Sequence, residues 1–108
     1  MQSVERAARN ESVFRELNEQ LDAAASGLPA GPRGFVCECS NIACTAVVAV
    51  STDHYEEVRR HPDRFIVSAD ESHVEPAIET IVVRRPGYWV VEKTGTAGDL
   101  AERLDPDA

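Results

Sequence analysis

The sequence predicts a small α+β domain, in which an antiparallel sheet of two β-hairpins plus one strand is flanked by helices at both ends. Near the N-terminus, apolar residues recur at three- and four-residue spacing, which is typical of a helix. Short β-rich runs separated by turn residues follow in the middle of the chain. Its 108 residues, 43% of them apolar, suffice for one modest core, so we expect a single domain over residues 1–108.

The first expected element is an amphipathic helix over residues 3–26. Its apolar positions have helical spacing and charged residues between them; they are Phe14, Leu17, Leu21 and Ala24. The segment SGLPAGPRG, with three glycines and two prolines, ends the helix and makes residues 27–34 a linker to a body at 35–108. The helix could use its apolar face either to dock on that body or to anchor a partner.

The body is expected to begin with a hairpin. FVCEC and TAVVAV are β-rich and are separated by SNIAC, which predicts two antiparallel strands with cysteines at the tip. A helix is then expected from Asp53 to His61, because Asp53 and Glu56 have capping-box spacing and Pro62 stops it. The next segment, RFIVS, resembles a strand.

A second hairpin and a short helix complete the prediction. In the segment 74–84, Glu75 and Pro76 are compatible with a short helix, but we expect a strand in its second half, TIVV. The dipeptide PG at positions 86–87 fits a type II turn joining ETIVVR to YWVVE. The last helix is expected to be capped by Asp99, with Glu102 three residues on, and to end at proline 106.

The charge of the chain argues against a nucleic-acid partner. The formal net charge is −8 and the pI is about 4.8, whereas a phosphate-binding surface is normally basic. No apolar run approaches the roughly 18 residues of a membrane span, and MQSVERAARN lacks the apolar core of a signal peptide. We expect a cytoplasmic protein without nucleic-acid or membrane partners.

All three cysteines, Cys37, Cys39 and Cys44, lie within eight residues. An odd number of thiols in a reducing cytoplasm argues against structural disulfides. Alternation along FVCEC places Cys37 and Cys39 on one face and Glu38 on the other. Free thiols buried as small apolar residues are the simplest alternative, but a third thiol at the tip is hard to explain by packing alone. The pattern therefore predicts one structural Zn²⁺ per chain.

The fourth zinc ligand has to be a histidine, because a structural site needs four ligands and the chain has no fourth cysteine. His61 precedes Pro62 and suits the C-terminus of the helix, where a cation is favourable. His54 lies ten residues after Cys44 at a helix start, a placement found in treble-clef-like sites. The third candidate, His73, lies in the polar loop ADESH between strands expected to neighbour the hairpin. We expect the site to consist of Cys37, Cys39, Cys44 and His73, with His54 as the alternative fourth ligand.

Three functions are compatible with such a site. The leading one is a zinc-stabilised regulatory module that binds another protein, or a second copy of itself, through the N-terminal helix. A thiol-based redox or zinc sensor would use the same cysteines. A zinc-dependent hydrolase-type enzyme would need an open metal position and a carboxylate such as Glu38 or Glu71, and the sequence lacks the H-x-E and P-C-x-x-C signatures of deaminase-type sites.

Four segments together resemble a known family; they are RNESVFRELNEQL, FVCECSNIACTAVVAVSTDHYEEVR, RFIV followed by His73, and YWVVEKTGTAGDLAERLDP. The family consists of small acidic actinobacterial-type proteins of unknown function that carry a C-E-C-x4-C knuckle. The resemblance covers nearly the whole chain. It implies a metal-binding fold and favours His73 over His54, although Glu71 and Ser72 replace the usual proline and glycine; it implies no activity.

Overall fold

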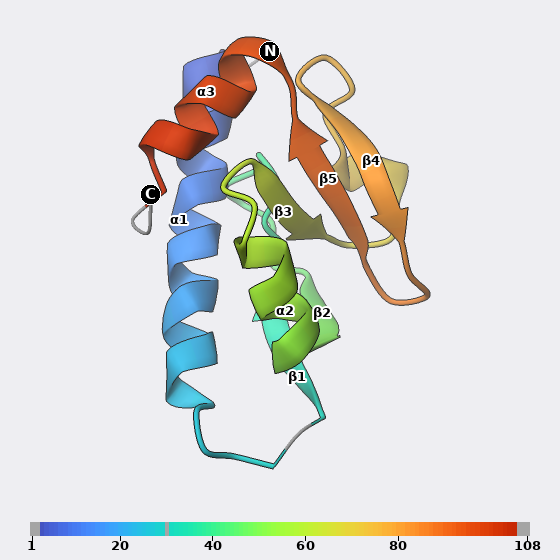
Figure 1. Cartoon of the computed structure of the whole chain (residues 1–108). Helices are drawn as coiled ribbons and strands as arrows, with labels where there is room; N and C mark the ends of the chain where they lie inside the picture. The colour runs from blue at the N-terminus through green and yellow to red at the C-terminus, as the bar shows by residue number, and fades with distance from the viewer. Residues whose placement is uncertain (1–2, 30, 106–108) are drawn as a thin grey trace.

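The computed structural model describes residues 3–29 and 31–105, and in these ranges the chain forms three α-helices, one short 3-10 helix and five strands (Figure 1). In chain order they are α1 (Val4–Ala24), β1 (Pro32–Val36), β2 (Val47–Ser51), α2 (Thr52–Arg59), β3 (Arg64–Val67), the 3-10 helix η1 (Glu71–His73), β4 (Glu79–Arg84), β5 (Trp89–Lys93) and α3 (Gly95–Arg103). The α+β class predicted from the sequence is confirmed, with a long helix first and a short helix last. Proline 106, the expected end of α3, lies outside the described residues.

The strands form two antiparallel sheets, whereas the sequence predicted one. β1 pairs with β2, and β5 lies between β3 and β4. Where the two sheets meet, the N–H of Glu38 donates to the carbonyl of Ile66 at 2.8 Å, but the N–H of Ile66 donates to the Glu38 carboxylate at 2.9 Å. Because a side chain takes the place of a backbone carbonyl there, the sheets do not merge into a continuous ladder.

The two expected hairpins are present with differences in detail. β1 ends at Val36, so Cys37 and Cys39 lie in the loop that follows the strand and not within it. The turn between β4 and β5 contains Gly87, as expected, but this glycine does not have the positive φ that a type II turn requires. Residues 76–78 form a turn and not a helix, so the strand expected in the second half of the 74–84 segment is confirmed as β4.

Two helix caps differ from the prediction. α2 begins after Ser51, whose hydroxyl accepts the His54 N–H at 3.2 Å, so the expected cap at Asp53 is wrong. α3 begins four residues before the expected cap at Asp99, because Gly95 adopts a φ of 55° and turns the chain directly from β5 into the helix. Serine and glycine at the junctions thus decide where these helices start.

Helix α1 runs along one side of the molecule, and α3 lies across its N-terminal half (Figure 1). The buried face of α1 is mostly polar; the buried residues are Ala7, Ala8, Glu11, Arg15 and Asn18. Of the anchors predicted from the sequence, Leu17 is 42% exposed and Leu21 is 38% exposed, while Phe14 is half-buried. The helix therefore docks on the body through a polar face next to its apolar face, for which the sequence left docking and partner binding open.

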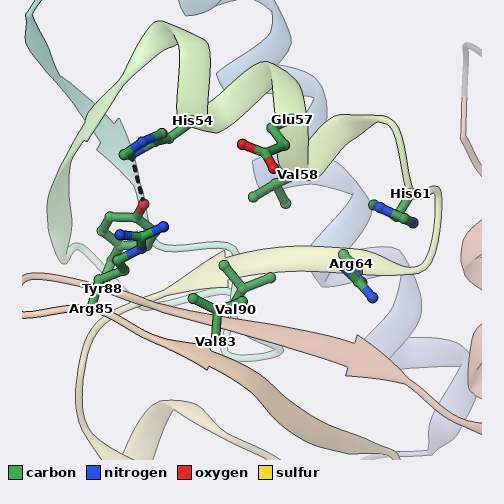
Figure 2. Close-up of a pocket in the computed structure, with 9 residues that line it drawn as sticks. All are labelled: His54, Glu57, Val58, His61, Arg64, Val83, Arg85, Tyr88 and Val90. Atoms are coloured by element: carbon green, nitrogen blue, oxygen red, sulfur yellow. Dashed lines mark hydrogen bonds between the residues drawn. The ribbon is translucent and has the colours of Figure 1, made fainter.

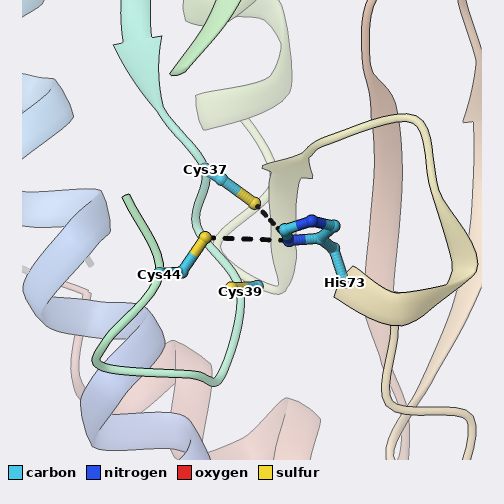
Figure 3. Close-up of side chains that lie close together, drawn as sticks. All are labelled: Cys37, Cys39, Cys44 and His73. Carbon is cyan, nitrogen blue, oxygen red and sulfur yellow. Dashed lines mark hydrogen bonds between the residues drawn. The ribbon is translucent and has the colours of Figure 1, made fainter. Parts of the chain in front are cut away.

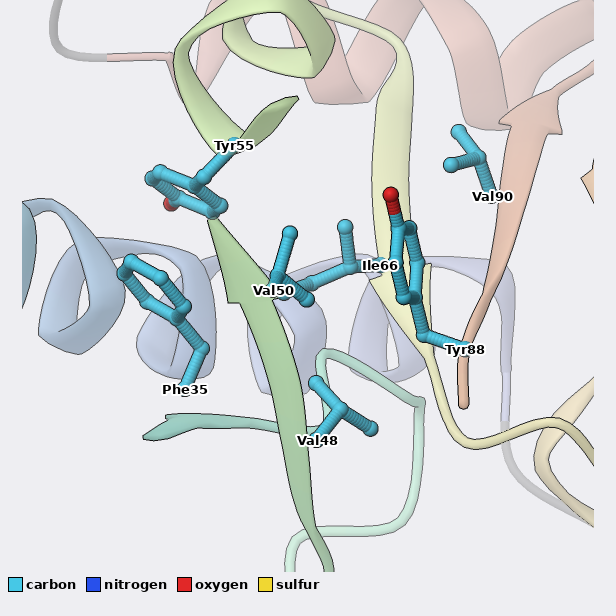
Figure 4. Packing of buried hydrophobic residues seen from close by; sticks show 7 residues of the cluster. All are labelled: Phe35, Val48, Val50, Tyr55, Ile66, Tyr88 and Val90. Carbon is cyan, nitrogen blue, oxygen red and sulfur yellow. The ribbon is translucent and has the colours of Figure 1, made fainter. Parts of the chain in front are cut away.

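The main apolar core lies between the two sheets and α2. The rings of Phe35 and Tyr55 stack with centroids 4.5 Å apart. Around them pack the remaining members of the cluster shown in Figure 4, namely Val48, Val50, Ile66, Tyr88 and Val90. A second cluster contains Cys37 and Cys39 together with Phe65, Val67, Val91 and Ala101, so two of the three thiols form part of the core wall.

Candidate metal centre

Three thiols are brought together by the loop between β1 and β2. The N–H of Cys37 donates to the carbonyl of Ala46 at 3.0 Å, which closes the base of the loop. At its tip, the N–H of Cys44 donates to the carbonyl of Asn41 at 2.9 Å, and the Asn41 side chain accepts the N–H of Ala43 at 3.0 Å. These bonds fold the tip back, so that Cys44 returns to the side of Cys37 and Cys39.

His73 reaches the thiols from the other sheet. It is the last residue of η1, in the polar loop between β3 and β4. Asp70 shapes this loop, because its carboxylate accepts the N–H of Ser72 at 2.7 Å and its carbonyl accepts the N–H of His73 at 3.0 Å. The loop predicted to supply the fourth ligand is thus a fixed turn that points the imidazole at the cysteine loop.

The four side chains converge on one point (Figure 3), and their ligand atoms all lie within 4.8 Å of one another. The Nδ1 atom of His73 is 3.5 Å from the Sγ of Cys37 and 3.7 Å from the Sγ of Cys44. In a tetrahedral site with Zn–S of about 2.3 Å and Zn–N of about 2.0–2.1 Å, neighbouring N and S ligands are about 3.6 Å apart. The two N–S distances match this spacing, so the four side chains can hold a metal ion.

The electrostatics around the thiols favour a thiolate at Cys37. A hydrogen bond from Cys39 is the largest cause and, with the N–H of Ser68 donating to Sγ at 3.2 Å, it lowers the pKa of Cys37 to about 5 despite burial. The same contact raises the pKa of Cys39, whose thiol holds the shared proton. Cys37 and Cys39 are only 1% and 3% exposed, whereas Cys44 and His73 are half-buried. The site can thus be reached from solvent on one side only.

The carboxylate of Glu38 points away from the thiols, as the alternation in FVCEC predicted. It is completely buried, and accepts hydrogen bonds from the Asn18 amide at 2.9 Å, the Tyr55 hydroxyl at 3.1 Å and the Ile66 N–H at 2.9 Å. Burial outweighs these bonds and raises the pKa of Glu38 to about 7. Since its oxygens are engaged on the far side of the loop, Glu38 is not placed to activate a water at the metal centre.

The structure separates the other two histidines from the cysteines. His54 and His61 line a different hollow of about 90 Å³ beside α2 (Figure 2), where His54 Nδ1 lies 3.3 Å from the Tyr88 hydroxyl. His54 lies ten positions after Cys44, but five of the nine residues between them form β2, and a strand advances about 3.3 Å per residue. β2 therefore carries His54 away from the loop, and the alternative fourth ligand is not part of the cluster.

No local sequence pattern marks the residues that support the cluster. Ser68 contacts the Cys37 sulfur across a separation of 31 positions, and Asn18 contacts the segment around Glu38 across about 20. Neither residue stands in a local pattern that distinguishes it from other serines and asparagines of the chain. Only the packing of α1 and β3 against the cysteine loop reveals them.

Among the described residues, no helix is long and apolar enough to cross a membrane. Comparison of the chain with protein-family models, with curated proteins and with solved structures gave no match. The fold and the cluster therefore define the class of protein by themselves. It is a small α+β protein with a Cys₃His cluster that can hold a metal ion.

Proposed function

We propose that the chain is a zinc-binding protein whose single Zn²⁺ is structural and is held by Cys37, Cys39, Cys44 and His73. The observation that carries this proposal is the convergence of three thiols and one imidazole within 4.8 Å. Thiolate and imidazole donors in tetrahedral arrangement are the set that Zn²⁺ prefers, whereas magnesium and calcium require oxygen donors. When bound, the metal would supply a cross-link between the β1–β2 loop and η1.

A structural role is favoured over a catalytic one because four protein donors leave no open coordination position. Glu38, the nearest carboxylate in sequence, makes its hydrogen bonds to Asn18, Tyr55 and Ile66 instead. Glu71 is exposed at the start of η1 and lines a surface hollow with Val74 and Ile81. These placements count against a hydrolase-type enzyme.

We further propose that the protein acts as an interaction module, with the exposed side of α1 as its partner surface. Its apolar side chains Val13, Leu17 and Leu21 are 54%, 42% and 38% exposed although the neighbouring face of the helix is docked. Burying such side chains against a partner would be favourable, since each contributes roughly 1.5–3 kcal/mol when fully buried. A zinc site of this kind needs reduced cysteines, which a reducing compartment maintains, and this favours a cytoplasmic location.

A redox sensor is the second candidate, favoured by the half-exposed position of Cys44 beside two buried thiols. A peroxide would oxidise the Cys44 thiolate to a sulfenic acid, releasing the other peroxide oxygen as water or alcohol. Attack by the Cys37 or Cys39 sulfur would then form a disulfide and release water. Mild peroxide should in that case eject zinc; a site that keeps its zinc under peroxide would exclude the sensor.

The experiment that tests the metal centre is native mass spectrometry of the purified chain and of two variants. We expect one zinc per wild-type chain, retention of zinc in His54→Ala, and its loss or weakening in His73→Ala. The two variants remove the same chemical group, but only His73 lies in the cluster. The proposal would be refuted if the wild-type protein carried no zinc after purification and bound none when zinc was added back.

A further inference from the structure

Helix α1 contacts the cysteine loop through two asparagines. The Nδ2 of Asn18 donates to the carbonyl of Val36 at 2.8 Å, and its Oδ1 accepts the N–H of Val36 at 2.8 Å. The Asn18 amide thus pairs with the edge of β1 as a neighbouring strand would, one residue before Cys37. Two turns earlier on α1, the Nδ2 of Asn10 donates to the carbonyl of Ser40, which lies between Cys39 and Cys44.

Glu38 connects these helix contacts to the candidate ligands. Asn18 donates a second bond from Nδ2 to the Glu38 carboxylate at 2.9 Å, and that carboxylate also binds the N–H of Ile66. The N–H of Cys37 bonds to Ala46 in one direction and the N–H of Glu38 to Ile66 in the other, so the backbone alternates here as in a strand although β1 ends at Val36. In such a segment neighbouring side chains point to opposite faces, so the direction of Glu38 sets the directions of Cys37 and Cys39. The contacts that hold Glu38 against α1 therefore aim both thiols at the metal position.

The docked face of α1 is polar at its centre, where Glu11 bonds to the ammonium group of Lys93 and Arg15 donates to the carbonyls of Pro62 and Ala101. Within the described part of the chain, Glu11 Oε1 and Arg15 Nε are nevertheless buried without a hydrogen-bond partner, and water would satisfy both if the helix moved away. Hydration would therefore offset part of the cost of undocking, and the asparagine contacts to the cysteine loop add to what holds α1 in place.

We propose that Asn18 and Glu38 are positioning residues of the metal centre. Through them, metal binding and docking of α1 each increase the equilibrium constant of the other by the same factor. The equality follows because the two events share one free energy of coupling. This inference rests on the proposed zinc site. It makes the metal a regulator of α1, the helix that carries the proposed partner surface.

Hydrogen exchange measured on the zinc-loaded and the chelator-treated wild-type chain tests the coupling directly. Because zinc also raises the global stability, amides of β3 and β5 report the change in global unfolding, which depends steeply on urea. We expect zinc removal to accelerate exchange of α1 amides at least about tenfold through a local opening that depends little on low urea concentrations. Exchange of α1 only together with these strands, with the same urea dependence, would mean that the metal supports the whole domain, and no change in α1 would mean that the two events are independent. Either result would overturn the coupling.

Zinc titration of two α1 variants tests the same inference from the other direction. Asn18→Ala should weaken zinc binding by about tenfold or more, the range found for residues that orient metal ligands, and should change the cobalt(II) absorption spectrum. Gln20→Ala, at an exposed position of the same helix, should change neither. Unchanged affinity and spectrum in Asn18→Ala would overturn the role of Asn18.

Two substitutions of Glu38 distinguish a positioning role from a general loss of stability. Glu38→Gln keeps an oxygen for the Ile66 N–H, although its NH2 group cannot accept from Asn18, and should lose less zinc affinity than Glu38→Ala. Glu38→Ala, which keeps neither contact, should lose at least as much affinity as Asn18→Ala. Equal losses in both Glu38 variants would contradict a positioning role. A wild-type chain that binds no zinc would refute the proposed function itself, whereas a zinc-binding wild type with an unaffected Asn18→Ala variant would refute only the coupling.

Discussion

The Nδ1 atom of His73 lies 3.5 Å from the Sγ atom of Cys37, although 36 positions separate the two residues in the chain. Cys37 follows β1 of the two-stranded sheet, and His73 belongs to the loop between β3 and β4 of the three-stranded sheet. The backbone ladder is interrupted between these sheets at Glu38 and Ile66. A metal bound by both residues would tie the sheets together where their hydrogen-bonded pairing ends.

Zinc is therefore expected to stabilise the fold. At a free concentration about 1,000 times its dissociation constant, zinc should add about 4 kcal/mol to the free energy of unfolding. In thermal unfolding followed by circular dichroism, Tm should fall on chelation and recover when zinc is restored. His54→Ala should show the same response as wild type, and His73→Ala a much smaller one. A wild-type Tm that does not respond to chelation would contradict this prediction.

Arg15 should contribute more to stability than any apolar residue of α1. Its guanidinium is buried, donates to the carbonyls of Pro62 and Ala101 at 2.7 and 3.1 Å, and lies 4.6 Å above the centre of the Phe65 ring. Arg15→Ala should lower the free energy of unfolding by about 3 kcal/mol, because two carbonyls lose a charged donor. Urea denaturation measures the change.

Lysine is the informative control at this position, because it keeps the charge but not the planar fork of donors. Arg15→Lys should recover less than half of the loss, since one ammonium group cannot reach both carbonyls and stack on Phe65 in the same way. Full recovery in Arg15→Lys would show that charge alone accounts for the effect.

Asp22 should make stability depend on pH. Burial, followed by the hydrogen bond and charge of Glu56, raises the pKa of Asp22 from 3.8 to about 6. The native state then binds a proton more tightly than the unfolded chain, so this group's contribution to stability falls as pH rises between about 4 and 6. Asp22→Asn should stabilise the protein at pH 7.5 by about 1 kcal/mol, allowing for its partial exposure, and should have little effect below pH 4.

Urea denaturation of wild type and Asp22→Asn at several pH values checks this sign. Glu16→Gln, which also removes a negative charge from α1 but at an exposed position, is the matched control and should have a much smaller effect. A destabilising effect of Asp22→Asn at pH 7.5 would be the opposite of the expected sign.

The exposed leucines should matter for association and not for folding. In the double variant Leu17→Gln, Leu21→Gln we expect a free energy of unfolding within about 0.5 kcal/mol of wild type, because both side chains already contact solvent. If the partner is a second copy of the chain, sedimentation equilibrium should show wild-type dimers and monomeric double variant. Marked destabilisation of the double variant would mean that Leu17 and Leu21 pack on the body and do not form a partner surface.

Local patterns in the sequence determined the helices, most of the strands and the four members of the cluster. Helical spacing, β-rich runs and the C-x-C-x4-C motif span a few residues each, and local steric and hydrogen-bonding preferences act over that range. The coordination number of zinc and a polar loop between two strands favoured His73 as the fourth member, but His54 stayed open as an alternative until the structure placed it outside the cluster.

Tertiary structure alone decided how these parts meet. The division into two sheets depends on the Glu38 carboxylate binding the N–H of Ile66, 28 positions away, and the docking of α1 depends on Arg15 reaching the carbonyl of Ala101, 86 positions away. The same packing left Leu17 exposed and placed Asn18 in the interior. Such contacts join groups with no local pattern in common, because a buried polar atom takes whichever partner the packing of the whole chain brings within reach.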